Sequence, residues 1–153
     1  MTPPIARVRP LEEHDLPALL ALYEQLHLAD DAHAPGSALA VWRHILTQPW
    51  IVHLGVFAGE TLAAACHAVI VPNLTHGARP YAIIEGVITH DAHRRQGHGA
   101  TAMRALIARC WDAGCYKVSL TSSVKRAEAH AFYRRLGFTT GNKHAFVLLR
   151  DAP

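Results

Sequence analysis

The stretch "HRRQGHGATAMRAL", residues 93–106, is the most informative part of this sequence. It joins two arginines and two glycines to a run whose apolar residues have helical spacing. Gly97 and Gly99 carry no Cβ, so the backbone can approach a ligand closely. Backbone N–H groups at a helix start are unpaired, and the helix dipole adds partial positive charge there. The stretch therefore predicts a phosphate site at a helix N-terminus. The alternative is a tight strand-to-helix turn with solvated arginines.

Two familiar phosphate-binding patterns do not fit this loop. A P-loop needs Gly-Lys-Ser or Gly-Lys-Thr at its end, whereas residues 98–100 are His-Gly-Ala. Residues 97–102 match the dinucleotide pattern GxGxxA, but that site also needs an acidic residue about 20 positions later. The strand predicted at residues 116–121 contains no acidic residue. We therefore set the NAD interpretation aside.

The hydrophobic patterns on either side of the loop predict strands and helices in close order. Four helices are expected: one capped by Asp15, one capped by Ser37, one from the loop to about residue 113, and one ended by Gly137. Strands are expected at residues 5–9, 50–57, 62–71, 81–89, 116–121, 138–140 and 144–149. This order predicts an α/β fold with a mixed sheet. Gly86, inside one strand, predicts a bulge or a close approach by a ligand.

Composition narrows the class of protein. The 153 residues fit one domain spanning residues 1–153, and 50% of them are hydrophobic. The net charge of +3 is mild and the basic residues are scattered, which argues against a nucleic-acid-binding module. Cys66, Cys110 and Cys115 lack the pairing of a disulfide framework or a zinc site, so we expect buried thiols and no metal. With no secretory signal and no stretch of membrane-spanning length, we expect a cytoplasmic protein that does not bind a membrane.

Three segments together resemble the GNAT family of N-acetyltransferases. Arg94-x-x-Gly97-x-Gly99 resembles the family's [QR]-x-x-G-x-[GA] loop. Residues 129–138, AHAFYRRLGF, resemble its A-x-x-x-Y-x-x-x-G-F segment, and residues 84–89 occupy the position of its fourth strand. The resemblance implies a mostly antiparallel central sheet of about seven strands with about four flanking helices. It also implies acetyl-CoA as the acyl donor.

The resemblance implies which residues bind the donor. The pantetheine arm would pair with the backbone of Val87, Ile88 and Thr89. The pyrophosphate would lie on the loop, and the full set implied for the loop and the helix is Arg94, Arg95, Gln96, Gly97, His98, Gly99, Ala100 and Phe132. Many members carry an asparagine seven residues before the tyrosine, where this chain has Arg126. Arg126 either meets a phosphate or faces solvent.

Acetyl transfer to an amine poses two proton problems. An alkyl amine has a pKa of about 10.4 and arrives protonated, while the departing thiolate benefits from a proton. Tyr133 stands at the family's tyrosine position and is the candidate acid, the alternative being a core aromatic. Glu85, a carboxylate in an apolar strand, is the candidate base, the alternative being an ion pair with Arg79 or a histidine. The resemblance also implies that a backbone N–H near Val87 stabilises the oxyanion.

The predicted function is acetyl-CoA-dependent N-acetylation of a primary amine on a small molecule, by direct attack in a ternary complex. A non-catalytic acyl-CoA-binding or regulatory domain, and a protein or peptide N-acetyltransferase, stay open as alternatives. A homodimer is compatible with the sequence but not required by it. The side chains offered to the acceptor include His14, Tyr23, His27, Asp30, Asp31, His33, Trp42, Arg79 and His144.

Overall fold

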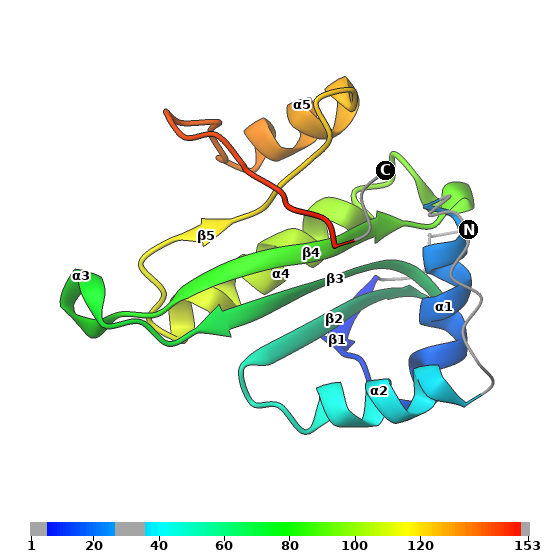
Figure 1. The fold of residues 1–153 in the computed structure, drawn as a ribbon. Coiled ribbons are helices and arrows are strands. Elements are labelled where there is room, and N and C mark those ends of the chain that lie inside the picture. Colours follow the sequence, from blue (N-terminus) through cyan, green and yellow to red (C-terminus); the bar gives the residue numbers. More distant parts are fainter. Residues whose placement is uncertain (1–5, 27–35, 151–153) are drawn as a thin grey trace. The chain divides into compact units, whose positions relative to one another are not determined.

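The computed structural model describes residues 6–26 and 36–150, which belong to two compact units, Met1–Leu120 and Thr121–Pro153 (Figure 1). The strands of the first unit are β1 (Arg7–Pro10), β2 (Ile51–Ala58), β3 (Thr61–Val71), β4 (Tyr81–Thr89) and β5 (Val118–Ser119). Its helices are η1 (Glu13–Asp15), α1 (Leu16–Glu24), α2 (Ser37–Leu46), the short α3 (Thr75–Ala78), η2 (Asp91–His93) and α4 (His98–Asp112). The second unit contains α5 (Ala127–Arg135).

The five strands form one sheet in the order β1-β2-β3-β4-β5. The first four are antiparallel to their neighbours and β5 is parallel to β4, which confirms the predicted mixed, mostly antiparallel sheet. The expected count of about seven strands is too high. The segment predicted at 116–121 pairs over only two residues, and 138–140 and 144–149 form no strand. The second unit contains no strand among its described residues, 121–150, so nothing there offers a sheet edge to complete the hydrogen bonds of these segments.

Helices cover both faces of the sheet (Figure 1). The face under α1 and α2 holds a core cluster in which Leu19, Leu22 and Trp42 meet the strands through Phe57, Leu62, Ala65 and Ile88. Met103, Leu106 and Cys110 of α4 are fully buried on the other face. The alternation of side chains along β3 places Ala65 and His67 toward α1, and Cys66 toward α4. The sheet is therefore a rigid platform enclosed between two helical layers.

Two predicted helix caps differ in detail. Asp15 does precede α1, but its carboxylate accepts hydrogen bonds from the Glu12 N–H at 2.7 Å and from Arg9 at 2.6 and 2.8 Å. It therefore ties β1 to η1, because a buried carboxylate is stable only when it is paired. In α2 the cap position belongs to Gly36, and Ser37 is the first helical residue. No helix among the described residues is long and apolar enough to cross a membrane.

Candidate acyl-donor and acceptor site

The glycine loop leads directly into α4, as predicted. Arg95 has a φ of +61° and Gly97 a φ of +83°, so the chain turns through two left-handed residues before the helix begins at His98. Gly97 caps α4 without a side-chain hydrogen bond, and the Thr101 N–H donates to the Gly97 carbonyl at 2.9 Å. The N–H groups of the three residues between them precede the first helical bond and are available to an anion.

The loop is braced by its own side chains. Arg94 forms an ion pair with Asp91 at 2.6 Å, and the Gln96 amide donates to the Ala92 carbonyl at 3.2 Å. His98 is buried, and the rings of His90, His93 and His98 follow one another edge to face. His98 therefore offers an anion its backbone rather than its imidazole. Within residues 6–26 and 36–150 no three His, Cys, Asp or Glu side chains gather as metal ligands.

The strand before the loop has one edge that β5 leaves unpaired. β4 pairs with β3 as far as Thr89, opposite Ala64. On its other side β4 pairs with β5 only through Ala82 and Ile83, so β5 leaves β4 before Glu85 (Figure 1). The N–H and C=O groups of Val87–Thr89 on that side have no strand partner among the described residues of the first unit. An extended ligand chain can add there in the manner of a strand.

Gly86 makes a bulge in β4, which confirms the prediction for this glycine. Ala65 pairs with Ile88 and His67 with Glu85, so two residues of β4 lie opposite the single residue Cys66. The φ of Gly86 is +60°. A Cβ at this position would lie 2.8 Å from Nδ1 of His67 and 3.1 Å from the Tyr23 hydroxyl oxygen. Both the backbone conformation and the close approach require glycine here.

Glu85 is exposed on β4, directly opposite His67 across the strand pair. Paired positions project to the same side of a sheet, so the carboxylate and the imidazole are neighbours on one face. The alternative role for Glu85, a structural ion pair, does not occur among the described residues. Arg79 instead donates to the His76 carbonyl at 3.1 Å. Glu85 therefore has its charge available to a ligand.

His53 and His67 form a stack that the sequence did not predict. They are paired across β2 and β3, with ring centroids 4.3 Å apart and planes at 14°, and Trp42 meets His53 edge-on. Nδ1 of each ring is buried and has no hydrogen-bond partner among the described residues. Burial lowers the pKa of His53 to about 3 and lowers that of His67. Leaving such an atom unpaired costs about 1–3 kcal/mol.

The second unit holds Phe132 and Tyr133, both half-buried in α5. The Tyr133 ring lies edge to face with Phe132 at 5.3 Å and with Phe138 at 6.0 Å. Arg126 occupies the cap position of α5 and is exposed. Within its own unit it therefore faces solvent, which is one of the two alternatives that the sequence left open. The structure thus gathers Glu85, Val87–Thr89 and residues 94–100 in one continuous segment of the first unit, and places Phe132 and Tyr133 in the second.

The three cysteines are free and buried, as predicted. Burial raises the pKa of Cys66 to about 12 and that of Cys110 to about 11, and it also raises that of Cys115. These thiols stay protonated near neutral pH, and the thiolate is the nucleophilic form. Nothing in their surroundings prepares them for acyl transfer.

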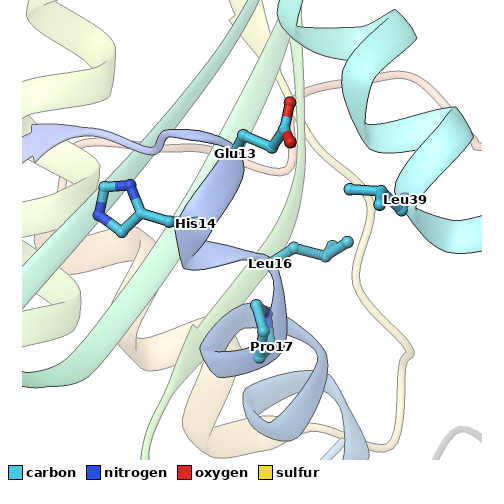
Figure 2. A pocket seen from close by; sticks show the side chains of 5 residues that line it. All are labelled: Glu13, His14, Leu16, Pro17 and Leu39. Atoms are coloured by element: carbon cyan, nitrogen blue, oxygen red, sulfur yellow. The ribbon is translucent and has the colours of Figure 1, made fainter.

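A shallow hollow is lined by residues of η1, α1 and α2 and by none of the predicted donor-binding residues (Figure 2). Glu13 and His14 project from η1, Leu16 and Pro17 from α1, and Leu39 from α2. Glu13 is held by Arg43 through hydrogen bonds of 2.7 and 3.0 Å. The hollow contains none of the predicted catalytic residues. Of the acceptor-side candidates, Trp42 is buried in the core, and His27, Asp30, Asp31 and His33 lie outside the described residues.

Comparisons with known proteins agree on one family. Residues 16–138 match the model of the Acetyltransferase (GNAT) family. The chain is 32% identical over 134 residues to a glucosamine 6-phosphate N-acetyltransferase of Trypanosoma brucei brucei, covering 86% of this chain and 87% of that protein. A putative acetyltransferase from Agrobacterium tumefaciens str. C58 superposes with a TM-score of 0.88 at 38% identity, over 94% of this chain and 99% of the other.

An aminoglycoside N-acetyltransferase, AAC(6')-Iy, whose structure was determined in complex with CoA, has the same fold. Its TM-score is 0.79 at 19% identity, with 95% of each chain covered. The matched family region includes the glycine loop, the bulged strand and the tyrosine helix. The chain belongs to the acetyltransferase (GNAT) family and is an N-acetyltransferase of that type.

Proposed function

We propose that this chain transfers the acetyl group of acetyl-CoA to a primary amine of a small molecule, by direct attack while both substrates are bound. Support for a small-molecule acceptor comes from the relatives, which are named for glucosamine 6-phosphate and for aminoglycosides. The raised pKa values of the buried cysteines support direct attack over a covalent acetyl-enzyme.

The residues present fit CoA, which supplies the acetyl group as an activated thioester. A Cβ built on Gly97 would meet nothing within 4 Å, so the space in front of the helix start is open. The N–H groups of the first turn and the side chain of Arg95 bind the pyrophosphate. The unpaired edge of Val87–Thr89 receives the pantetheine arm.

The chain's own residues handle charge and protons. The backbone N–H near Val87 donates to the acetyl carbonyl oxygen as negative charge develops on it, and such donors contribute about 2.7–4 kcal/mol. Glu85 attracts the ammonium group of the acceptor and, as the base, accepts a proton from it. Tyr133 gives a proton to the departing sulfur. We also propose that residues 1–153 act as one functional domain, because the tyrosine is in the second unit and the loop in the first.

The observation that carries this proposal is the continuity of residues 84–101. The unpaired edge of β4, its bulge and the glycine-capped start of α4 follow one another within a single segment. A structural turn alone would not need a strand edge left open by β5 directly before it.

Calorimetric titration of acetyl-CoA tests the proposal. We expect the unaltered chain to bind and Gly97→Glu to lose binding, because the added carboxylate faces the pyrophosphate. Gly59→Glu is the matched control: Gly59 lies in the β2–β3 turn with a φ of +63°, against +83° for Gly97, and a Cβ would meet nothing within 4 Å at either site.

A panel of primary amines, including glucosamine 6-phosphate and an aminoglycoside, then identifies the acceptor by release of free CoA. Failure of the unaltered chain to bind acetyl-CoA would overturn the proposal. Binding without acetylation of any amine would favour the acyl-CoA-binding alternative.

A further inference from the structure

His67 lies beside the bulge that directly precedes the proposed donor-binding edge, Val87–Thr89. It projects from β3 beside the bulge, and its Nδ1 is the side-chain atom closest to the position of a Cβ on Gly86, at 2.8 Å. The side chain as a whole is half-buried, while Nδ1 is fully buried and has no partner among the described residues. Buried polar atoms are almost always paired, so an orphaned one beside a bulge points to a partner that arrives with the substrate.

His67 also has a carboxylate neighbour in the right place. Glu85 is its paired residue on β4, on the same face and exposed. The two side chains form no ion pair among the described residues. Once the imidazole is protonated, the carboxylate on the same face attracts it through its charge. The bulge begins at the residue after Glu85, so the two side chains project from the α1 face of the sheet next to the bulge.

We propose that His67 accepts the proton of the acceptor amine, with Glu85 stabilising the imidazolium that forms. This inference rests on the proposed function and changes the part of Glu85 from proton acceptor to charge partner. An ammonium group must lose two protons to become a neutral amide. One passes to Nδ1 of His67, and the imidazolium then releases a proton from its partly exposed ring to water. The other leaves as the C–N bond forms and the C–S bond breaks, and the sulfur takes one proton from Tyr133, which regains it from the nitrogen.

The groups that face His67 are suited to this role. His53, stacked behind it on β2, has a pKa lowered to about 3 by burial, so it stays neutral and does not repel an imidazolium. Burial raises the pKa of Tyr23, on α1, to about 12, so its hydroxyl keeps its proton and does not compete as a base. Burial lowers the pKa of His67 itself, which keeps the imidazole in the accepting form at neutral pH.

The test is the pH profile of kcat/KM for the best amine of the panel, measured for the unaltered enzyme and three variants. The acid side of this profile reports the base in the free enzyme. We expect His67→Gln to lower kcat/KM about 100-fold and to remove the acid limb. Glu85→Gln should keep the limb but move it to lower pH. His53→Gln, which alters the same stack one strand further from the bulge, should retain the rate and the limb.

Two outcomes would overturn the role of His67 and leave the proposed function intact. One is an acid limb that survives in His67→Gln and disappears in Glu85→Gln, which would make Glu85 the base. The other is an equal loss in His53→Gln and His67→Gln, which would show that the stack serves packing alone. If the unaltered chain acetylates no amine, the proposed function fails and the role of His67 fails with it.

A measurement on the unaltered protein covers the case in which His67→Gln does not fold. The imidazole of His67 is followed by ¹⁵N NMR as the pH is lowered. Its titration should coincide with the acid limb of kcat/KM, because both report the free enzyme. A titration at a different pH would overturn the proposal.

Discussion

Arg95 has the most unusual backbone conformation of the non-glycine residues in the loop. Its φ of +61° places a residue with a full side chain in the left-handed region, where glycine is usual. Residues held in this way tend to occur at ligand sites, where the surrounding structure fixes them. The bracing by Asp91 and by the Ala92 carbonyl supplies that support on either side of it.

Tyr133 carries a prediction that separates chemistry from binding. Tyr133→Phe removes only the hydroxyl and keeps the ring contacts with Phe132 and Phe138. We expect kcat to fall about 100-fold, because the departing sulfur loses its proton donor, while the affinity for acetyl-CoA is unchanged. Steady-state kinetics and calorimetry measure the two quantities.

Tyr81→Phe, at another half-buried tyrosine, is the control and should leave kcat unaltered. A Tyr133→Phe enzyme with the kcat of the unaltered chain would make Tyr133 a core aromatic and no more.

The glycines and the acidic and tyrosine candidates could be predicted from the sequence, but the pairing of His53 with His67 could not. A regular hairpin that starts from the pair Ala58 and Thr61 would place His53 opposite Cys66. The register shifts between Val56 and Phe57, where Ala63 is left over on β3, and this brings His67 opposite His53. One extra residue in a strand is invisible to a pattern of alternation.

Among the elements, β4 was predicted with its exact bounds because its apolar run ends at clear turn residues. The helices α1, α2, α4 and α5 were predicted for a similar reason, since caps and stops flank regular apolar spacing. The strands predicted at residues 138–140 and 144–149 are absent, because a strand exists only where a partner offers hydrogen bonds, and apolar alternation says nothing about that partner.

The bulge in β4 gives a prediction at this scale. Gly86→Ala adds a methyl group 2.8 Å from Nδ1 of His67 in a backbone with a φ of +60°. Gly59→Ala imposes the same strain at a φ of +63° but meets nothing within 4 Å. We expect Gly86→Ala to lower the free energy of unfolding by about 1–3 kcal/mol more than Gly59→Ala does, because only it crowds the interior.

Urea denaturation of the two variants isolates the crowding from the backbone strain. Equal losses of stability would show that His67 and Tyr23 move aside without cost, and the close approach at Gly86 would then contribute nothing to the free energy of unfolding.

For the molecule as a whole, the buried histidines make stability depend on pH. The pKa of His53 is about 6.5 in an unfolded chain and about 3 in the folded one. Above pH 6.5 the ring is neutral in both states. Below it the unfolded chain binds a proton that the folded chain does not, so the free energy of unfolding falls by up to about 1.4 kcal/mol per pH unit for this group. His67 acts in the same direction.

Protonation of Asp15 lowers the free energy of unfolding further at lower pH. The hydrogen bonds from Arg9 lower the pKa of its carboxyl below the usual value, so its contribution is lost as the pH falls below about 4. We expect Tm to decline from about pH 6.5 downward, with a steeper decline below about pH 4.

Calorimetric Tm values between about pH 7.5 and about 2.5 check this expectation. His53→Phe should flatten the upper part of the decline, since the ring no longer titrates. His144→Phe, at an exposed histidine, should leave it unchanged. A decline that is the same in His53→Phe would assign the pH dependence to other groups. The homodimer and the cytoplasmic location stay predictions, and sedimentation of the purified chain addresses the first.

The way β5 leaves β4 has a consequence for handling this protein. A strand edge whose N–H and C=O groups are not paired with a neighbouring strand can pair with any extended chain, including a second copy of the same molecule. A donor that lies along Val87–Thr89 shields that edge and stabilises the folded state by mass action. The ligand-free enzyme should therefore aggregate more readily than the complex when it is concentrated, and added coenzyme A should reduce that aggregation.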